Sequence, residues 1–414
     1  MLKLNKRKFL NLHEIYFLLF PIAILFRSAF LNTYIILGAI FFICNIKKNK
    51  KIFLLLPIKI LMIFIVYLIL ISFNAENINH ALKSSISQIR FFLFMLFIVF
   101  LEIRKNKLPL IFFLFSILVY FIIFDTMWQF FFTVDFFGIG ADPEFNPHRL
   151  SGPFGNELIV GSYITYLSIP IVAFFFNKIK KATILEKIYY ISFIIFSFIT
   201  ILISGERISL LIFMSSFLIL LIIYLDKIKL GISIFCLITS IIFSYNYNEG
   251  VKYRFNVFAN DIVDFKYSNH GRLFSSAYTV WQKNYITGTG LKNYRIECDN
   301  LKNINYIDPF TNMEIICSTH PHNAYFQILA ETGIVGFLFF LFFITSSALF
   351  FLKKKIEITN EFKPLFLSAI IIFASYVWPI KSSGSFFSTY AGSYFWFYYG
   401  AILLCILKSK KTIN

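Results

Sequence analysis

The chain has 414 residues, of which 58% are hydrophobic and 20% aromatic, and its mean hydropathy is +0.74. Only 14% of the residues are charged, which excludes a water-soluble globular domain and indicates a membrane protein. The formal net charge is +18, but Lys and Arg occur in short clusters between apolar runs. This distribution favours membrane topology over nucleic-acid binding.

Apolar runs of roughly 17 to 25 residues, the length that crosses ~30 Å of hydrocarbon, recur along the chain. We predict an all-α polytopic membrane protein with about 12 transmembrane helices. The first ten residues resemble the basic region of a signal peptide without a cleavage site, so we expect a retained anchor. The predicted spans are 14–30, 31–46, 52–73, 90–103, 108–133, 157–176, 189–203, 208–225, 230–245, 323–352, 364–380 and 391–407.

Alternate connections between these spans must lie on the same side of the membrane. One set carries 24 of the 39 Lys and Arg residues in short segments, so both termini are expected in the cytoplasm. The opposite, extracytoplasmic set is the turn near Arg27, 74–89, 134–156, 204–207, 246–322 and 381–390. The predicted organisation is therefore nine spans in 1–245, an extracytoplasmic lid in 246–322 and three spans in 323–414.

The segment 246–322 is 77 residues long and nearly balanced in charge, with eight Lys or Arg and seven Asp or Glu. A long loop of this kind is usually functional, and we expect it to fold as a small lid. Cys298 and Cys317 lie 19 positions apart in it. Because disulfides persist outside the cytoplasm, we predict that these two residues form one.

Two short polar motifs lie in the other extracytoplasmic connections. In "HRLSGPFGNE", residues 148–157, Arg149 either anchors a helix end at the membrane surface or binds substrate. In "ISGERISLL", Arg207 is expected at the amino terminus of the next helix, where free N–H groups and the helix dipole favour an anion. Its planar guanidinium suits phosphate oxygens; the alternative is a local salt bridge with Glu206.

The third motif runs through residues 269–295 and 318–337. Arg272 lies near the start of an amphipathic segment that ends at Gly288-Thr289-Gly290, which is either a backbone nest for an anion or a plain turn. Asn323 is expected to begin a helix that continues to Leu352. At ~45 Å this helix exceeds the bilayer core, so its first turns should extend from the membrane with His322 at their exposed start.

The two histidines of this motif raise the question of a metal site. Cys317, His320 and His322 are close in sequence, but the chain has no second cluster of ligands at metal spacing. We therefore expect no metal and no cofactor. Neutral imidazole accepts a proton from a hydroxyl near neutral pH, so His322 is the candidate general base, whereas His320 is either a surface residue or a supporting one.

Basic side chains and one base on the outer face suggest a reaction with a self-activated donor. Nucleotide-activated sugars are cytoplasmic, whereas pyrophosphate-linked lipids carry their own leaving group. A departing pyrophosphate needs charge neutralisation more than a proton. Arg149, Arg207 and Arg272 are the candidate groups for that task.

The motifs "SGERISLL", Arg272…Trp281…Gly288-Thr289-Gly290 and "HPHNAYFQILAETGIVGF" resemble the signature region of the bacterial O-antigen ligase and polymerase family, C-type membrane glycosyltransferases. The resemblance implies metal-independent transfer of a glycan from undecaprenyl pyrophosphate to a hydroxyl, at the outer leaflet of the bacterial inner membrane. The roles that it implies are base for His322 and pyrophosphate binding for Arg207, Arg272 and Arg149. We expect His320, Asn323 and Glu331 to support these residues.

The acceptor separates two functions within this family. In a ligase it is a sugar of the lipid A core, as in lipopolysaccharide biosynthesis; in a polymerase it is a lipid-linked repeat unit. We expect the ligase, with the polymerase as the alternative, membrane lipids as surroundings and no nucleic-acid partner. A lipid-linked sugar transporter is disfavoured because the spans carry few charges and the polar residues gather on one face.

Overall fold

The structure is a computed structural model that describes residues 9–45, 50–139 and 149–410. All four basic residues of the amino-terminal segment, together with Lys47, Lys48, His148 and Lys411, lie outside the described residues. Within them the regular secondary structure is helical apart from one antiparallel pair of strands, β1 (Ile307–Asp308) and β2 (Met313–Glu314). The predicted all-α class is confirmed.

In the described ranges, nine helical segments are long and apolar enough to cross a membrane. They contain α3 (Arg27–Cys44), α4 (Leu56–Ile71), α5 (Ile78–Phe100), α6 (Leu108–Phe132), α7 (Val160–Lys178), α8 (Ile184–Ile203), α9 (Arg207–Tyr224), α14 (Ala324–Lys354) and α16 (Thr389–Lys410). The other predicted spans correspond to α1 (Leu12–Leu18) with α2 (Phe20–Leu25), α10 (Lys227–Tyr247) and α15 (Lys363–Tyr376). The protein is thus a multi-pass membrane protein.

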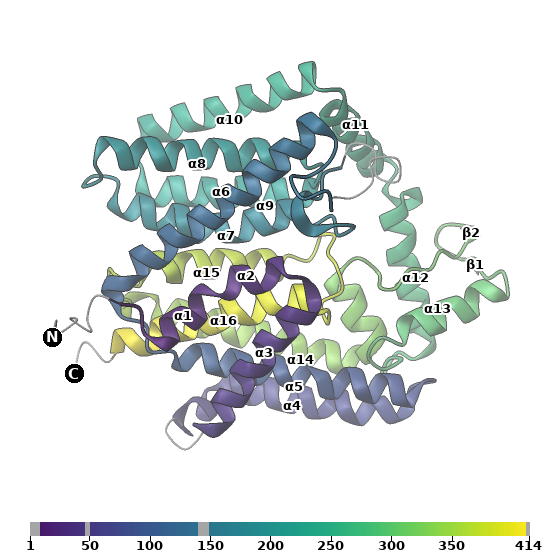
Figure 1. Ribbon diagram of the computed structural model, residues 1–414. Helices are drawn as coiled ribbons and strands as arrows, with labels where there is room; N and C mark the ends of the chain where they lie inside the picture. The colour runs from purple at the N-terminus through teal and green to yellow at the C-terminus, as the bar shows by residue number, and fades with distance from the viewer. Residues whose placement is uncertain (1–8, 46–49, 140–148, 411–414) are drawn as a thin grey trace.

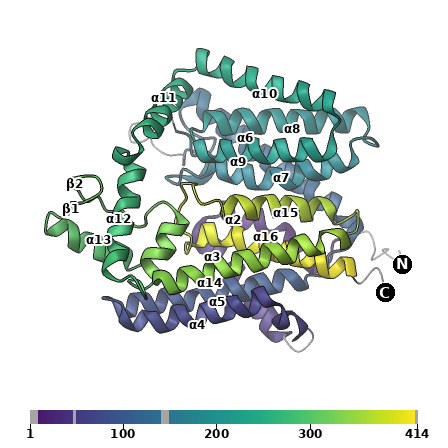
Figure 2. The same ribbon diagram turned by 180° about the vertical axis from the view of Figure 1, so that it is seen from behind.

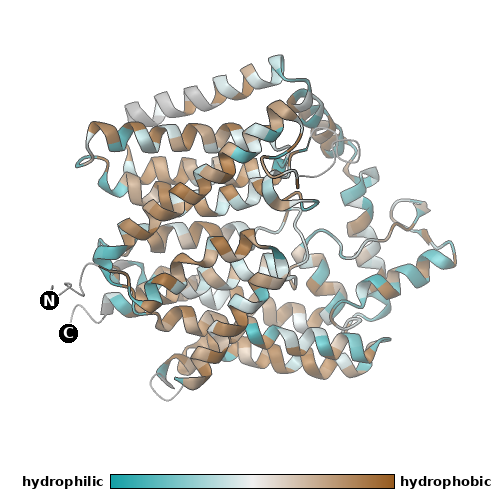
Figure 3. Cartoon of the chain, in the orientation of Figure 1, coloured by the Kyte–Doolittle hydropathy of each residue, from teal (hydrophilic) through white to brown (hydrophobic). Residues whose placement is uncertain are grey.

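Helices α7 and α16 form the centre of the bundle. Their most apolar stretches are 89% and 83% buried, against 28% for α8 and α14. Figure 3 shows hydrophobic residues along the bundle and hydrophilic ones at its ends and on the segment after α10. Helix α1 begins and α16 ends at the end of the bundle opposite to α12 (Asn269–Lys283) and α13 (Tyr294–Asn303), as Figures 1 and 2 show.

Two predicted boundaries are wrong. The first span, 14–30, is not one helix: Pro21 cannot donate a backbone hydrogen bond, and the left-handed backbone of Arg27 (φ 67°) separates α2 from α3. The connection 74–89 is also mostly helical, because α5 begins at Ile78. Its polar residues Ser85 and Gln88 are buried and hydrogen-bonded inside the protein, so average hydropathy does not reveal this part of the span.

The segment 246–322 folds as three helices, α11 (Glu249–Val263), α12 and α13, followed by the strand pair. A small apolar core holds α12, α13 and the strand region together and includes Val280, Tyr294 and Ile315. The predicted disulfide between Cys298 and Cys317 is present. Short 3-10 helices occur at Lys50–Leu54, Ser72–Asn74, Lys105–Lys107, Gly152–Phe154, Phe265–Tyr267 and Lys355–Glu357.

Helix α14 is broken at Gly333, whose φ of 65° and ψ of −173° are not helical. The loop before α13 fills the break: Thr289 N–H donates to Ala330 O at 3.0 Å, and Ile334 N–H donates to Tyr285 O at 2.8 Å. The predicted continuous helix from Asn323 to Leu352 is therefore wrong. Gly290 N–H likewise donates to a helix carbonyl, that of Glu331, at 2.9 Å, so Gly288-Thr289-Gly290 is a structural turn rather than an anion nest.

Candidate functional site

A cavity of about 1160 Å³ lies where the turns at one end of the bundle meet α11 and α12. Its walls come from the loop before α7, the turn between α8 and α9, residues 319–322 and the connection between α15 and α16. Seven Lys or Arg side chains and only two Glu side chains line it. The seven cations are Arg27, Arg149, Arg207, Arg254, Lys292, Arg295 and Lys381. The cavity is therefore suited to an anion.

Three of these arginines form a cluster on one side, which we call the arginine cluster: Arg149, Arg207 and Arg254. Burial lowers the pKa of Arg149 and of Arg254, and the charge of Arg207 lowers both further. Arg254 comes from α11, whereas Arg207 is the first residue of α9. Partly buried cations that lower one another's pKa repel one another, and a bound anion relieves that repulsion.

Arg207 also contacts α11 directly. Its Nη1 lies 3.3 Å from Asp261 Oδ2, and its guanidinium stacks 5.4 Å above the ring of Phe258. The neighbouring carboxylate of Glu206 turns the other way, toward the start of α7, and accepts hydrogen bonds from the N–H groups of Gly161 and Ser162. Glu206 is thus a positioning group for α7 rather than the ion-pair partner of Arg207.

Three imidazoles stand next to one another in the cavity. The ring centres of His320 and His322 are 4.2 Å apart, and those of His322 and His270 are 5.8 Å apart. Burial lowers the pKa of all three rings, that of His320 to about 4. Each ring is therefore neutral near pH 7, the state that accepts a proton from a hydroxyl.

The backbone around His322 is held in an unusual conformation. His322 has a φ of 57°, and its carbonyl accepts a hydrogen bond of 2.7 Å from Ser383 N–H. Asn323 caps α14 by accepting from the N–H of Tyr325, as predicted, and donates to the carbonyls of Pro379 and Lys381. The start of α14 and the 381–390 turn are thus joined by the hydrogen bonds of Asn323.

Glu331, the other predicted supporting residue, does not line the cavity. It is fully buried in α14, and Gln327 Nε2 donates to its Oε2 at 3.3 Å. The same amide group donates to Ser385 Oγ at 2.9 Å. Glu331 therefore belongs to the packing that holds the 381–390 turn against α14.

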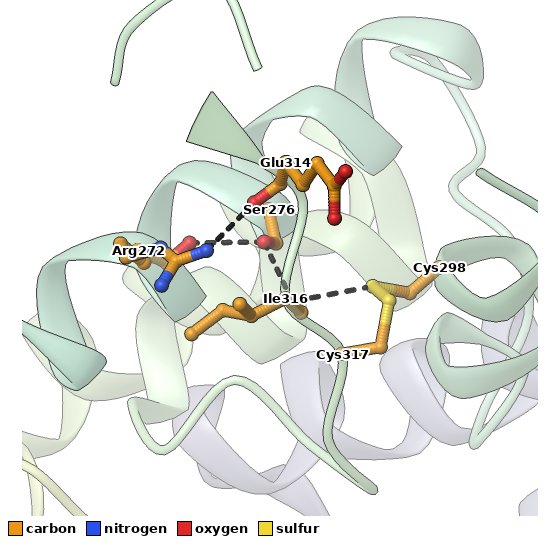
Figure 4. The surroundings of a disulfide bond; sticks show 6 residues. All are labelled: Arg272, Ser276, Cys298, Glu314, Ile316 and Cys317. Carbon is orange, nitrogen blue, oxygen red and sulfur yellow. Dashed lines mark hydrogen bonds between the residues drawn. A yellow bond between two sulfur atoms is a disulfide. The ribbon is translucent and has the colours of Figure 1, made fainter. Parts of the chain in front are cut away.

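Arg272 lies away from the cavity, contrary to the expectation that it joins Arg207. Its Nη2 donates to Glu314 O at 2.8 Å, beside the disulfide between Cys298 and Cys317 (Figure 4). Ser276 on the same helix donates to the carbonyl of Ile316 at 2.7 Å. Arg272 thus fastens the strand region to α12 and is not available to a ligand in the cavity.

Lys381 is a cavity residue that the sequence motifs did not indicate. It is 9% exposed, its Nζ lies 4.4 Å above the ring of Tyr376, and it donates to the hydroxyl of Tyr166 at 3.4 Å. Burial lowers its pKa to about 7. A buried ammonium that contacts only aromatic and hydroxyl groups among the described residues is a ready partner for an anion.

No cluster of three or more His, Cys, Asp or Glu side chains suitable for a metal ion occurs in the part of the chain that the structure describes. The cavity lining supplies arginine, lysine and imidazole side chains. These groups can neutralise a phosphate leaving group and accept a proton from a hydroxyl.

Residues 192–341 match the profile of a family described as O-antigen ligase. The match extends from α8 into α14 and includes Arg207, Arg254 and the three histidines, so the predicted resemblance is confirmed over this region. No curated protein matches the chain.

Proposed function

We propose that this protein is an O-antigen ligase, which transfers a glycan from undecaprenyl pyrophosphate to a sugar hydroxyl of the lipid A core. The family match supports a ligase or polymerase. The observation that carries the proposal is the cavity in which the arginine cluster and the pair His320 and His322 face the same space. A diphosphate and a reacting hydroxyl fit this combination of groups.

In the proposed reaction the arginine cluster binds the diphosphate of the donor. The acceptor hydroxyl attacks the anomeric carbon, and His322 takes the hydroxyl proton. The new bond joins this carbon to the acceptor oxygen, while the bond to the diphosphate oxygen breaks and undecaprenyl diphosphate leaves. Because this is a single displacement, the configuration at the anomeric carbon inverts.

The reaction requires the cavity on the periplasmic side of the inner membrane. The concentration of Lys and Arg in the opposite set of connections supports cytoplasmic termini. The ends of α1 and α16 lie away from α12 and α13 (Figure 1), which agrees with this orientation. Reporter fusions after Tyr247 and within residues 304–306 test it, and a cytoplasmic signal there would refute the proposal.

The lipopolysaccharide of a deletion strain tests the function. We expect free lipid A core together with polymer that remains on the lipid carrier. Re-expressed Arg207→Ala and His322→Ala variants should not restore the ladder although they reach the membrane. Normal ladders with either variant would remove the basis of the proposed mechanism.

An O-antigen polymerase is the second candidate, because the cavity has further cations beyond the arginine cluster, among them the neighbouring pair Lys292 and Arg295. A polymerase joins two lipid-linked glycans and so must hold two diphosphates. In the deletion strain it would leave core that carries a single repeat unit, which distinguishes it from the ligase.

A further inference from the structure

Lys292 and Arg295 line the cavity from the start of α13. The backbone of Lys292 is left-handed, with a φ of 58°, a conformation that costs free energy for a residue with a side chain. The neighbouring Asn293 accepts a hydrogen bond from Asn77 N–H at 3.0 Å. The turn that carries both cations is thus attached to the segment before α5 and held in a strained shape.

Neither cation is neutralised by an ion pair in the described part of the chain. No carboxylate lies within 4.0 Å of either Lys292 or Arg295 there, and the Nε of Arg295 is buried without a hydrogen-bond partner. Burial lowers the pKa of Lys292, and the charge of Arg295 lowers it further. Partly buried cations that repel one another are costly unless an anion binds between them.

Glu331 is the carboxylate nearest to this pair: its charge acts on Lys292, it interacts with the charge of Arg295 as well, and it accepts a hydrogen bond from the backbone N–H of Lys292. It accepts a hydrogen bond from Gln327 and lies outside the cavity lining. One buried carboxylate set back in α14 does not account for two cations that face the cavity.

The histidines lie between these cations and the arginine cluster. The charge of Arg207 lowers the pKa of His270, whereas the charge of Arg295 lowers that of His320. Between those two rings stands His322, in contact with both. The order across the cavity is therefore arginine cluster, candidate base, then Lys292 and Arg295.

We infer that Lys292 and Arg295 form a second anion site, which binds a phosphate group of the acceptor. The inference rests on the proposed function. A base that removes the acceptor proton must lie between the donor and the acceptor, so a second cationic site beyond it belongs to the acceptor. The acceptor is thus a phosphate-bearing glycan, and its phosphate places the hydroxyl next to His322.

Two acceptors share this chemistry. One is a glycan on polyprenyl diphosphate, and the other is a core oligosaccharide with a phosphate ester on a sugar ring. In either case the two anionic substrates bind at separate places: the donor at the arginine cluster, and the acceptor at Lys292 and Arg295.

Binding of farnesyl diphosphate to the full-length protein in nanodiscs tests the number of sites. We expect calorimetry to give two equivalents for the native protein and one for the Lys292→Gln/Arg295→Gln double variant. Arg207→Gln should weaken the binding of farnesyl diphosphate at the arginine cluster. Lys302→Gln, which removes an exposed lysine on α13, is the matched control and should bind two.

The outcomes separate the two proposals. The native protein could bind only one equivalent of farnesyl diphosphate. If Arg207→Gln weakens that binding and the Lys292→Gln/Arg295→Gln variant does not, the acceptor site is overturned and the proposed function still stands. Binding that is insensitive to Arg207→Gln contradicts the proposed diphosphate site. Two equivalents that survive in the double variant also overturn the inference.

Transfer assays then distinguish the sources of the phosphate. The acceptors are one glycan presented on polyprenyl diphosphate, on a neutral alkyl chain, and on the neutral chain with a phosphate ester on the sugar. Arg295→Gln should raise the KM of whichever phosphate-bearing acceptor the enzyme uses about tenfold more than the KM of the neutral acceptor, as expected for a charge-assisted contact. An equal rise for all three acceptors would indicate a merely structural role and would overturn the inference.

Discussion

Asp261 on α11 and Arg207 at the start of α9 form an ion pair of 3.3 Å at the wall of the cavity. Their side chains are 32% and 27% exposed, and a partly exposed pair of this kind contributes little to stability. A diphosphate carries more charge than one carboxylate. We therefore expect the donor to displace Asp261 from Arg207.

This relationship gives the first prediction. Asp261→Asn should lower the KM for the lipid-linked donor severalfold, because an uncharged amide competes less with the diphosphate. Asp264→Asn, which changes an exposed carboxylate of the same segment, is the control. Transfer kinetics measure the effect, and a raised KM for Asp261→Asn would mean instead that Asp261 orients Arg207 for binding.

The sequence predicts the parts of the site that local rules determine. Arg207 begins a helix after a tight turn, and Asn323 caps α14 directly after His322; both follow from residue type and position. Average hydropathy also identifies helices that face lipid. It fails for the start of α5, where Ser85 and Gln88 are buried against other protein groups.

The error at Arg272 concerns which side of a helix faces the cavity. His270 and Arg272 are two positions apart on α12, and residues at this spacing do not lie on the same face of a helix. Once His270 lines the cavity, Arg272 points toward Glu314 instead. Arg254 and Lys381 come from distant segments, and only their packing brings them to the site.

The pH dependence of the reaction follows from the lowered pKa of His322. Burial disfavours the charged imidazolium, so the neutral base persists below the ordinary value of 6.5. The kcat/KM should therefore fall only as pH drops below 6.5. Bound diphosphate stabilises the imidazolium, so the acid limb of kcat should lie at a higher pH than that of kcat/KM.

Rate profiles of the native protein and of Asp264→Asn should coincide. An acid limb of kcat/KM above pH 6.5 would show that His322 is not the base or that its pKa is not lowered. His322→Gln should reduce the rate by roughly 10²–10⁴-fold, the usual contribution of general base catalysis.

Lys381 should give donor affinity its own dependence on pH. Burial lowers its pKa to about 7, so the free enzyme loses this positive charge as pH rises through 7. If the ammonium binds the diphosphate, the donor KM rises over this interval. Lys381→Arg should remove the rise because guanidinium stays charged, whereas Lys381→Met should raise the KM at pH 6 about tenfold.

The disulfide between Cys298 and Cys317 should stabilise the segment 246–322. It closes a loop with a sequence separation of 19, and constraint of a loop of this size contributes ~3 kcal/mol. The Cys298→Ser/Cys317→Ser variant should therefore show faster hydrogen exchange in α12 and α13. Cys44→Ser removes a free thiol and is the control; equal exchange in both variants would contradict the prediction.

Gly333 forms the break in α14 into which the 285–290 loop packs, on the same helix that begins next to His322. A Cβ at this residue would overlap the carbonyl oxygen of Ile286, and its φ of 65° is strained for any other residue. Gly333→Ala should therefore expel the 285–290 loop from the helix break. The hydrogen bonds from Thr289 N–H to Ala330 O and from Ile334 N–H to Tyr285 O would be lost. The turn bearing Lys292 and Arg295 would then no longer be aligned with α14.

We expect transfer by Gly333→Ala to fall more than about tenfold, since misplacement of reacting groups by ~1 Å costs up to 10²-fold. Hydrogen exchange should increase at Thr289 and Ile334, whose N–H groups bridge the break. Gly231→Ala on α10 meets no neighbouring atom and should keep full activity. A native transfer rate and slow hydrogen exchange at Thr289 and Ile334 in Gly333→Ala would contradict this prediction. In that case α14 alone would hold His322 in position, without the 285–290 loop in the helix break.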